Sequence, residues 1–164
     1  MPRVPRVPYD PRLKKEGLMK TLHDPSHRGD LVRRLAALTP NSERKWGKMS
    51  VDQMLWHVGD ALALSLGEIT VSAEKPPIPR GLLKFVVLNL PWGKNGPTHS
   101  AFVAKRNYDF TAERTRCLQL IDKVASRGLH SNWPDHPVFG RMTGEQVSRL
   151  HAKHLNHHLN QFGV

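Results

Sequence analysis

The sequence lacks paired cysteines, a long apolar run and a signal-peptide pattern. Cys117 is its only cysteine, so no internal disulfide can form, which fits a reducing cytosol. The most apolar run, residues 82–90, is about half as long as a membrane-spanning helix and includes Lys84. Residues 1–18 contain no uninterrupted apolar stretch of the kind that a signal peptide needs. We therefore expect a cytoplasmic protein with no membrane partner.

Acidic side chains are also scarce, since 14 Asp and Glu stand against 25 Lys and Arg, for a net charge of +11 with His neutral. Residues 1–18 hold five basic and two acidic side chains, so they contribute +3 and the rest of the chain keeps +8. Such a surface attracts nucleic acid, acidic lipid or a small anionic substrate, although a solvated basic surface without a partner is the more common case. Aromatic residues make up only 7%, and the Lys and Arg clusters are short. No nucleic-acid recognition motif is present, so nucleic-acid binding is an alternative function and not the leading one.

The length and composition suit one soluble domain. The chain has 164 residues, of which 38% are hydrophobic and 24% charged. Residues 1–18 carry Pro at positions 2, 5, 8 and 11, which excludes a helix interior or a central strand there. We predict that residues 1–18 form a disordered or extended basic tail and that residues 19–164 form a single helical domain.

Helix signals divide residues 19–164 into four main helices. Asp24-Pro25 is an N-cap followed by proline at the first helical position. Ser50–Gln53 and Thr143–Gln146 each have the pattern of a capping box. Apolar residues recur at helical spacing after all three signals, and another helix is predicted from near Thr111 to Gly128. No alternating strand pattern of any length occurs.

Residues 70–108 are predicted to form a long irregular crossover between the second and third main helices. Three prolines between residues 76 and 79 exclude regular structure at its start, whereas Gly81–Leu90 predicts a short buried helix. The sequence therefore predicts an all-α fold, a four-helix bundle with an irregular crossover between helices 2 and 3.

Four of the ten histidines fall within eight residues of the last predicted helix. At about 100° per residue, with Val147 at zero, His151 lies near about 40°, His154 near about 340° and His158 near about 20°, all within the apolar stripe. His157, at about 280°, lies at the edge of the stripe. A buried imidazole needs partners for both ring nitrogens, and a metal ion on one side with an acceptor on the other supplies them. A single His on an apolar stripe is more often a satisfied core residue, so the prediction depends on the pair His154 and His158, one turn apart.

A metal site needs at least a third ligand, from another element. His57 in the second helix is the natural candidate, although it lies on the flank of that helix's apolar stripe. Helical spacing alone ranks it barely above His99, His130 and His136. Whether His151 or His157 contributes stays open at this point.

Several motifs together resemble one branch of the DinB superfamily, a branch known only as a domain of unknown function. They are Met19–Pro25, Trp46–Ser50 followed by Gln53-Met54-Leu55 and His57, His136–Gly140, and His154–Gly163. The resemblance runs from about residue 19 to the C-terminus. It implies a DinB-like four-helix bundle, frequently dimeric, with a metal held by one His of the second helix and a His-x-x-x-His pair of the last. The matching positions are His57, His154 and His158.

The resemblance and the histidine pattern together predict a metal-dependent enzyme that acts on a small molecule. Characterised members of the superfamily resemble thiol-dependent transferases and a thiol-dependent isomerase, whereas the branch resembled here has no assigned reaction. The resemblance therefore makes thiol-dependent transfer or hydrolysis a candidate chemistry and not an assigned one. Zinc is expected first by ligand type, although imidazole sites also accept nickel, iron and copper. The basic surroundings would suit an anionic substrate or a thiol.

Four further residues have a candidate role near such a site. Gln53, Asp60 and Gln161 lie near the predicted ligands along their helices and are candidates to orient them, although ordinary helix-surface polarity is the favoured explanation of each. Cys117 lies among helix-core residues, where a thiol is usually inert packing. We therefore expect no catalytic role for it.

Overall fold

The structure, a computed structural model, describes residues 20–164. The predicted tail, residues 1–18, lies outside the described residues. The fold of residues 20–164 is all-α: helices are joined by loops, and no strand is present. An isolated β-bridge between His136 and Gly140 closes one of the loops. The five α-helices are α1 (Pro25–Ala36), α2 (Val51–Leu66), α3 (Arg80–Asn89), α4 (Phe110–Ser126) and α5 (Gly144–Gln161).

Capping side chains begin α1 and α5 where the sequence predicts. Asp24 Oδ1 accepts hydrogen bonds from the backbone N–H groups of Ser26 and His27, at 2.8 and 3.1 Å. Thr143 Oγ1 accepts from the Gln146 backbone N–H at 3.2 Å, and Gln146 Oε1 accepts from the Thr143 N–H at 3.1 Å. These bonds satisfy amides that have no partner within the helix, so both predicted starts are confirmed.

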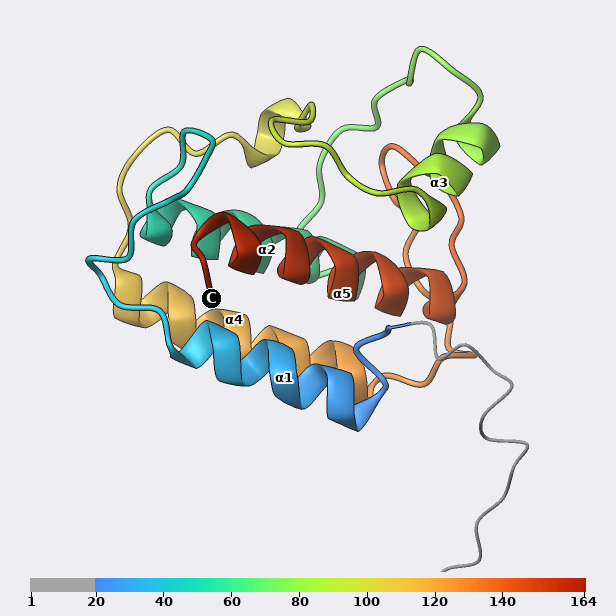
Figure 1. Ribbon diagram of the computed structural model, residues 1–164. Coiled ribbons are helices and arrows are strands. Elements are labelled where there is room, and N and C mark those ends of the chain that lie inside the picture. The colour runs from blue at the N-terminus through green and yellow to red at the C-terminus, as the bar shows by residue number, and fades with distance from the viewer. Residues whose placement is uncertain (1–19) are drawn as a thin grey trace, which may run out of the picture.

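Four helices pack around one core, to which α3 adds a single buried residue, Leu88. α2 packs along α4, α1 and α2 both contact α5, and α1 also contacts α4. Figure 1 shows α1 and α4 side by side below α2 and α5, with α3 apart at the upper right. The core is made of aliphatic side chains brought to one side of each helix by its period. Its largest fully buried members include Leu22, Leu31, Leu35, Leu38, Met54, Leu55, Leu62, Ile121, Leu155 and Leu159.

α3 forms where a helix was predicted, but it is not the buried helix that was expected. Leu88 is its only buried residue, whereas Leu82 and Phe85 are 53% and 58% exposed. Its principal contact is with α5. The prediction of burial was wrong because apolar residues lie on all sides of this segment, so their spacing does not tell which side faces the core.

The rest of the crossover between α2 and α4 runs along the outside of the core. It contains a short 3-10 helix, η2 (Ser100–Phe102), which contacts α2 and buries the side chain of Phe102. This contact brings the backbone of the crossover against the middle of α2. Within residues 20–164, no helix combines the length and the apolar character needed to cross a bilayer.

Candidate metal centre

Three imidazoles meet between α2 and α5. His57 comes from α2, and His154 and His158 come from successive turns of α5. His154 Nε2 lies 2.9 Å from His57 Nε2 and 3.0 Å from His158 Nε2. One ring nitrogen from each residue lies within 4.8 Å of the other two. The structure therefore brings together the three residues that the sequence and the resemblance singled out.

Two of the rings are fixed by hydrogen bonds from their other nitrogen. His57 Nδ1 donates to the backbone carbonyl of Phe102 at 3.0 Å, and His158 Nδ1 donates to Gln161 Oε1 at 2.8 Å. Because a carbonyl oxygen only accepts, each Nδ1 carries the hydrogen. In the neutral ring Nε2 then holds a lone pair, and both lone pairs face His154 Nε2.

Gln161 is itself held in place by the loop before α2. Its Nε2 donates to the backbone carbonyl of Trp46 at 2.8 Å, and its backbone carbonyl accepts from the Lys45 N–H at 2.7 Å. Gly47 has a φ of +83°, and a Cβ there would lie 2.3 Å from Gln161 Nε2. A side chain at position 47 would therefore strain the backbone and displace the amide that orients His158.

Burial keeps the three imidazoles uncharged. It is the main cause that lowers the pKa of His57 and, well below the ordinary value of 6.5, the pKa of His154. Burial, followed by the neighbouring His57, lowers the pKa of His158 to about 3. At neutral pH the rings are therefore neutral, which is the form that binds metal ions.

This donor set fits a divalent ion that prefers imidazole. A tetrahedral zinc ion with bonds of about 2.0–2.1 Å places its nitrogen ligands about 3.3–3.4 Å apart, slightly wider than the 2.9 and 3.0 Å found here. Without a metal ion, a hydrogen on His154 Nε2 can be shared between His57 Nε2 and His158 Nε2. A cation at the same point could instead accept a lone pair from each of the three rings. Three protein ligands also leave coordination positions open, which is typical of catalytic rather than structural zinc.

The other polar candidates have different roles. Gln53 Oε1 accepts from the Ser50 N–H at the start of α2, and Gln53 Nε2 donates to a backbone carbonyl of the crossover. Asp60 pairs with Arg116 at 2.7 Å. Of the three residues proposed to orient the ligands, only Gln161 contacts one. Cys117 is buried, and burial raises the pKa of its thiol to about 12, so the thiol stays protonated and packs in the core.

The remaining histidines lie outside the group of three. His151 Nε2 lies 2.7 Å from Ser65 Oγ, and His151 Nδ1 is buried without a hydrogen-bond partner. The His157 ring lies 6.0 Å from the Trp46 ring and 5.5 Å from the Trp92 ring. Neither residue belongs to the metal-compatible group, and the same holds for the loop residues His99, His130 and His136.

Sequence reasoning missed two neighbours of the imidazoles. The Phe102 carbonyl is a backbone group, so no residue type could have indicated it. Trp92 lies in the crossover, with its ring 5.9 Å from that of His154 and Lys153 Nζ 5.3 Å above it. Lys94 Nζ lies 5.0 Å from the Trp46 ring in the same manner. An aromatic and basic rim therefore borders the imidazoles.

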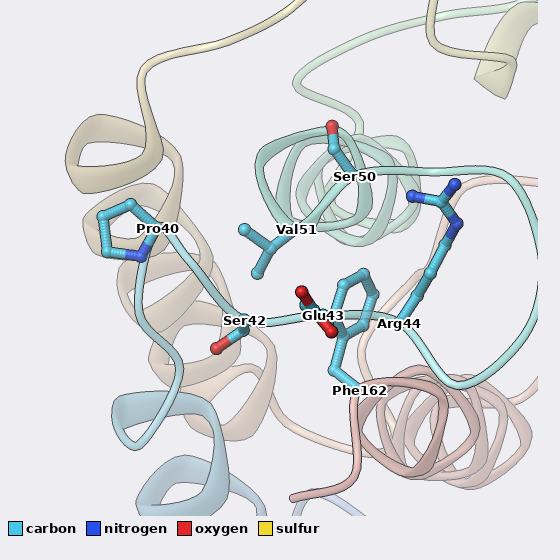
Figure 2. A pocket seen from close by; sticks show the side chains of 7 residues that line it. All are labelled: Pro40, Ser42, Glu43, Arg44, Ser50, Val51 and Phe162. Atoms are coloured by element: carbon cyan, nitrogen blue, oxygen red, sulfur yellow. The ribbon is translucent and has the colours of Figure 1, made fainter.

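A separate pocket of about 370 Å³ lies near the start of α2. Figure 2 shows that its lining comes from the linker after α1, the first residues of α2 and Phe162 at the end of α5. Glu43 and Arg44 give it one charge of each sign, and none of the three imidazoles lines it. The pocket therefore offers no ligand set of its own.

Comparison with known families places the chain without assigning a reaction. A family model described as "Protein of unknown function (DUF1569)" matches residues 82–163, half of the chain. The chain belongs to this family. The matched segment includes His154 and His158 and begins after His57. The search of curated proteins and the search of solved structures each gave no match.

Proposed function

We propose that this member of the DUF1569 family binds a divalent metal ion through the Nε2 atoms of His57, His154 and His158 and acts as a metal-dependent enzyme on a small molecule. The observation that carries the proposal is the convergence of these atoms, with N···N distances of 2.9 and 3.0 Å, while two of the rings donate from Nδ1 to carbonyl oxygens. Zinc is the first expectation by ligand type, and nickel or iron would also suit three imidazoles.

We further propose that the fold is a DinB-like four-helix bundle made of α1, α2, α4 and α5. Two observations support this: these helices share the core, and the imidazoles come from the second and the last helix of the set, as the resemblance implies. The long crossover that carries α3 also agrees with the expected connection between the second and third helices of the bundle.

The chemistry follows from the donors and their surroundings. A divalent ion held by these three neutral imidazoles would act as a Lewis acid. It would lower the pKa of a bound water or thiol and so provide a nucleophile at neutral pH. His57 and His158 would be held in orientation by the Phe102 carbonyl and by Gln161. Lys94 and Lys153 lie above the two tryptophans of the rim, and their charges favour an anionic substrate or a thiolate.

The direct test is the metal content of untagged protein and of three variants, His57→Ala, His154→Ala and His158→Ala. We expect about one ion per chain in the wild type and a large loss in each variant, because two remaining imidazoles hold a divalent ion far more weakly than three. The matched controls are His151→Ala and His157→Ala, which remove histidines of the same helix from outside the group of three. They should retain the metal.

Equal metal content in the wild type and in all three variants would remove the proposal. Circular dichroism of each variant keeps the result interpretable, since a folded variant without metal supports a ligand role and an unfolded one does not. If one of the three alanine variants is unfolded, the corresponding Gln variant replaces it, because Gln keeps more of the side-chain volume and its amide is a poor ligand for zinc.

A further inference from the structure

The solvent-facing side of α3 is unusually apolar. Leu82 and Phe85 lie about one turn apart on it, 53% and 58% exposed. Ile78 precedes the helix and Leu90 follows it, 38% and 47% exposed. We call these four residues the α3 apolar face. Apart from Val103, they are all of the large hydrophobic residues that the structure leaves exposed among residues 20–164. Exposed apolar side chains gathered in this way mark an interaction surface.

Basic side chains surround this face without acidic partners. Lys75 and Arg80 line one surface pocket with Ile78, Lys84 lies on α3 itself, and Arg149 and Lys153 reach the C-terminal end of α3 from α5. Among residues 20–164, none of these five pairs with a carboxylate. Residues 75–108 contain no Asp or Glu at all. The positive charge around α3 is therefore not neutralised within this part of the protein.

The helix is held in a fixed position against α5. Lys153 Nζ donates to the Val87 carbonyl at 2.6 Å and Trp92 Nε1 donates to the same carbonyl at 2.7 Å. Arg149 donates to the Asn89 side chain at 3.0 Å. The C-terminal turn of α3 is thus anchored, so the apolar face is presented to solvent without any unfolding.

The combination of exposed apolar side chains and positive charge indicates which kind of partner the α3 apolar face binds. A second copy of the chain would bring the same five basic side chains against these, and like charges repel one another. Nucleic acid would satisfy the charges but would leave Leu82 and Phe85 with no apolar partner. An anionic bilayer satisfies both, because apolar side chains enter the boundary of the acyl chains while Lys and Arg stay at the headgroups.

We propose that the α3 apolar face and its basic surround form a docking surface for anionic lipid bilayers. The protein would lie on the membrane through α3 without crossing it. This proposal differs from the expectation of no membrane partner, which was based on the lack of a spanning segment and on the predicted burial of residues 81–90.

The test is sedimentation of the full-length protein with two kinds of vesicle, phosphatidylcholine alone and equal parts of phosphatidylcholine and phosphatidylglycerol. We expect the protein to bind the anionic vesicles and to bind phosphatidylcholine much more weakly. The double variant Leu82→Ser/Phe85→Ser should lose about tenfold or more in affinity, because neither side chain can then enter the bilayer. The matched control is Val103→Ser, which removes an apolar side chain of similar exposure (51%) outside α3 and should bind as the wild type does.

A second variant, Lys75→Ala/Arg80→Ala, tests the charge separately. Each basic residue near an anionic surface contributes about fivefold in affinity, so the pair should cost about 25-fold and added salt should weaken binding further. Absence of binding to anionic vesicles overturns the proposal, as does unchanged binding of the Leu82→Ser/Phe85→Ser variant. Self-association of the wild type that this double variant abolishes would assign the face to a second copy, and a DNA gel shift that it abolishes would assign the face to nucleic acid; either result also overturns the proposal.

Discussion

Two groups of histidines lie at the contact between α2 and α5, and they differ in the partners of their ring nitrogens. In one group His57, His154 and His158 converge, and two of the rings donate from Nδ1 to carbonyl oxygens. In the other, His151 contacts Ser65 through Nε2, and its Nδ1 has no partner. Burial lowers the pKa of His158 and of His151 alike, to about 3. A low pKa therefore does not distinguish the two groups of histidines, whereas the direction of the Nε2 lone pairs does.

The largest effect that separates the two groups is expected from Gln161. Replacing it with Leu removes the acceptor that orients His158, and loss of such a partner typically weakens metal binding by about 10–100-fold. The matched control is Gln53→Leu, because Gln53 lies one turn before His57 but contacts no imidazole. Metal titration of both variants measures the difference. Equal affinities for the two variants would contradict the role given to Gln161.

A smaller effect, on stability and not on metal, is expected at His151. Ser65→Ala leaves the buried His151 ring with no hydrogen-bond partner and should destabilise the protein by about 1–3 kcal/mol. The double variant His151→Leu/Ser65→Ala removes both polar groups and should recover much of that loss. Urea unfolding gives the free energies, and metal content should stay that of the wild type in both. Metal loss in either variant would show that the two groups form one site.

The pH dependence of unfolding is a further test of His151. Here the quantity measured is the change in the free energy of unfolding per pH unit. Because its pKa is about 3 in the folded protein and near 6.5 in the unfolded chain, the unfolded chain takes up the proton first. The stability that this residue contributes is complete above pH 6.5 and is lost as the pH falls from 6.5 toward 3, by about 1.4 kcal/mol per pH unit. With a chelator present throughout, His151→Leu should reduce the slope of the free energy of unfolding against pH by the amount that corresponds to the uptake of about one proton. An unchanged slope would contradict the burial of a neutral ring.

The sequence was informative where local rules decide the structure. Asp24 and Thr143 form the predicted caps, since an N-cap depends on side chains within a few residues of it. The spacing of His154 and His158 likewise follows from a single helix turn. The position of His57 could not be derived from its helix, because the wheel places it on a flank. Its surroundings come from elsewhere in the chain: η2 provides the Phe102 carbonyl, and α5 provides His154 and His158.

The exposure of α3 could not be derived for a related reason. An apolar segment with no polar side has no preferred orientation in a sequence pattern, and which of its sides is covered depends on how the chain returns. Here Lys153 and Trp92 fix one side of the helix against α5, which leaves Phe85 in solvent. The N-terminal matches of the resemblance helped most at His57, where spacing alone could not separate it from other histidines.

The metal assignment is tested most directly by anomalous diffraction from a crystal of untagged protein grown without added chelator. We expect one anomalous peak between α2 and α5, about 2.0–2.1 Å from the Nε2 atoms of His57, His154 and His158 if the ion is zinc. A full-length crystal with no peak there after soaking in zinc, in which the three rings merely share a proton, would contradict the metal assignment.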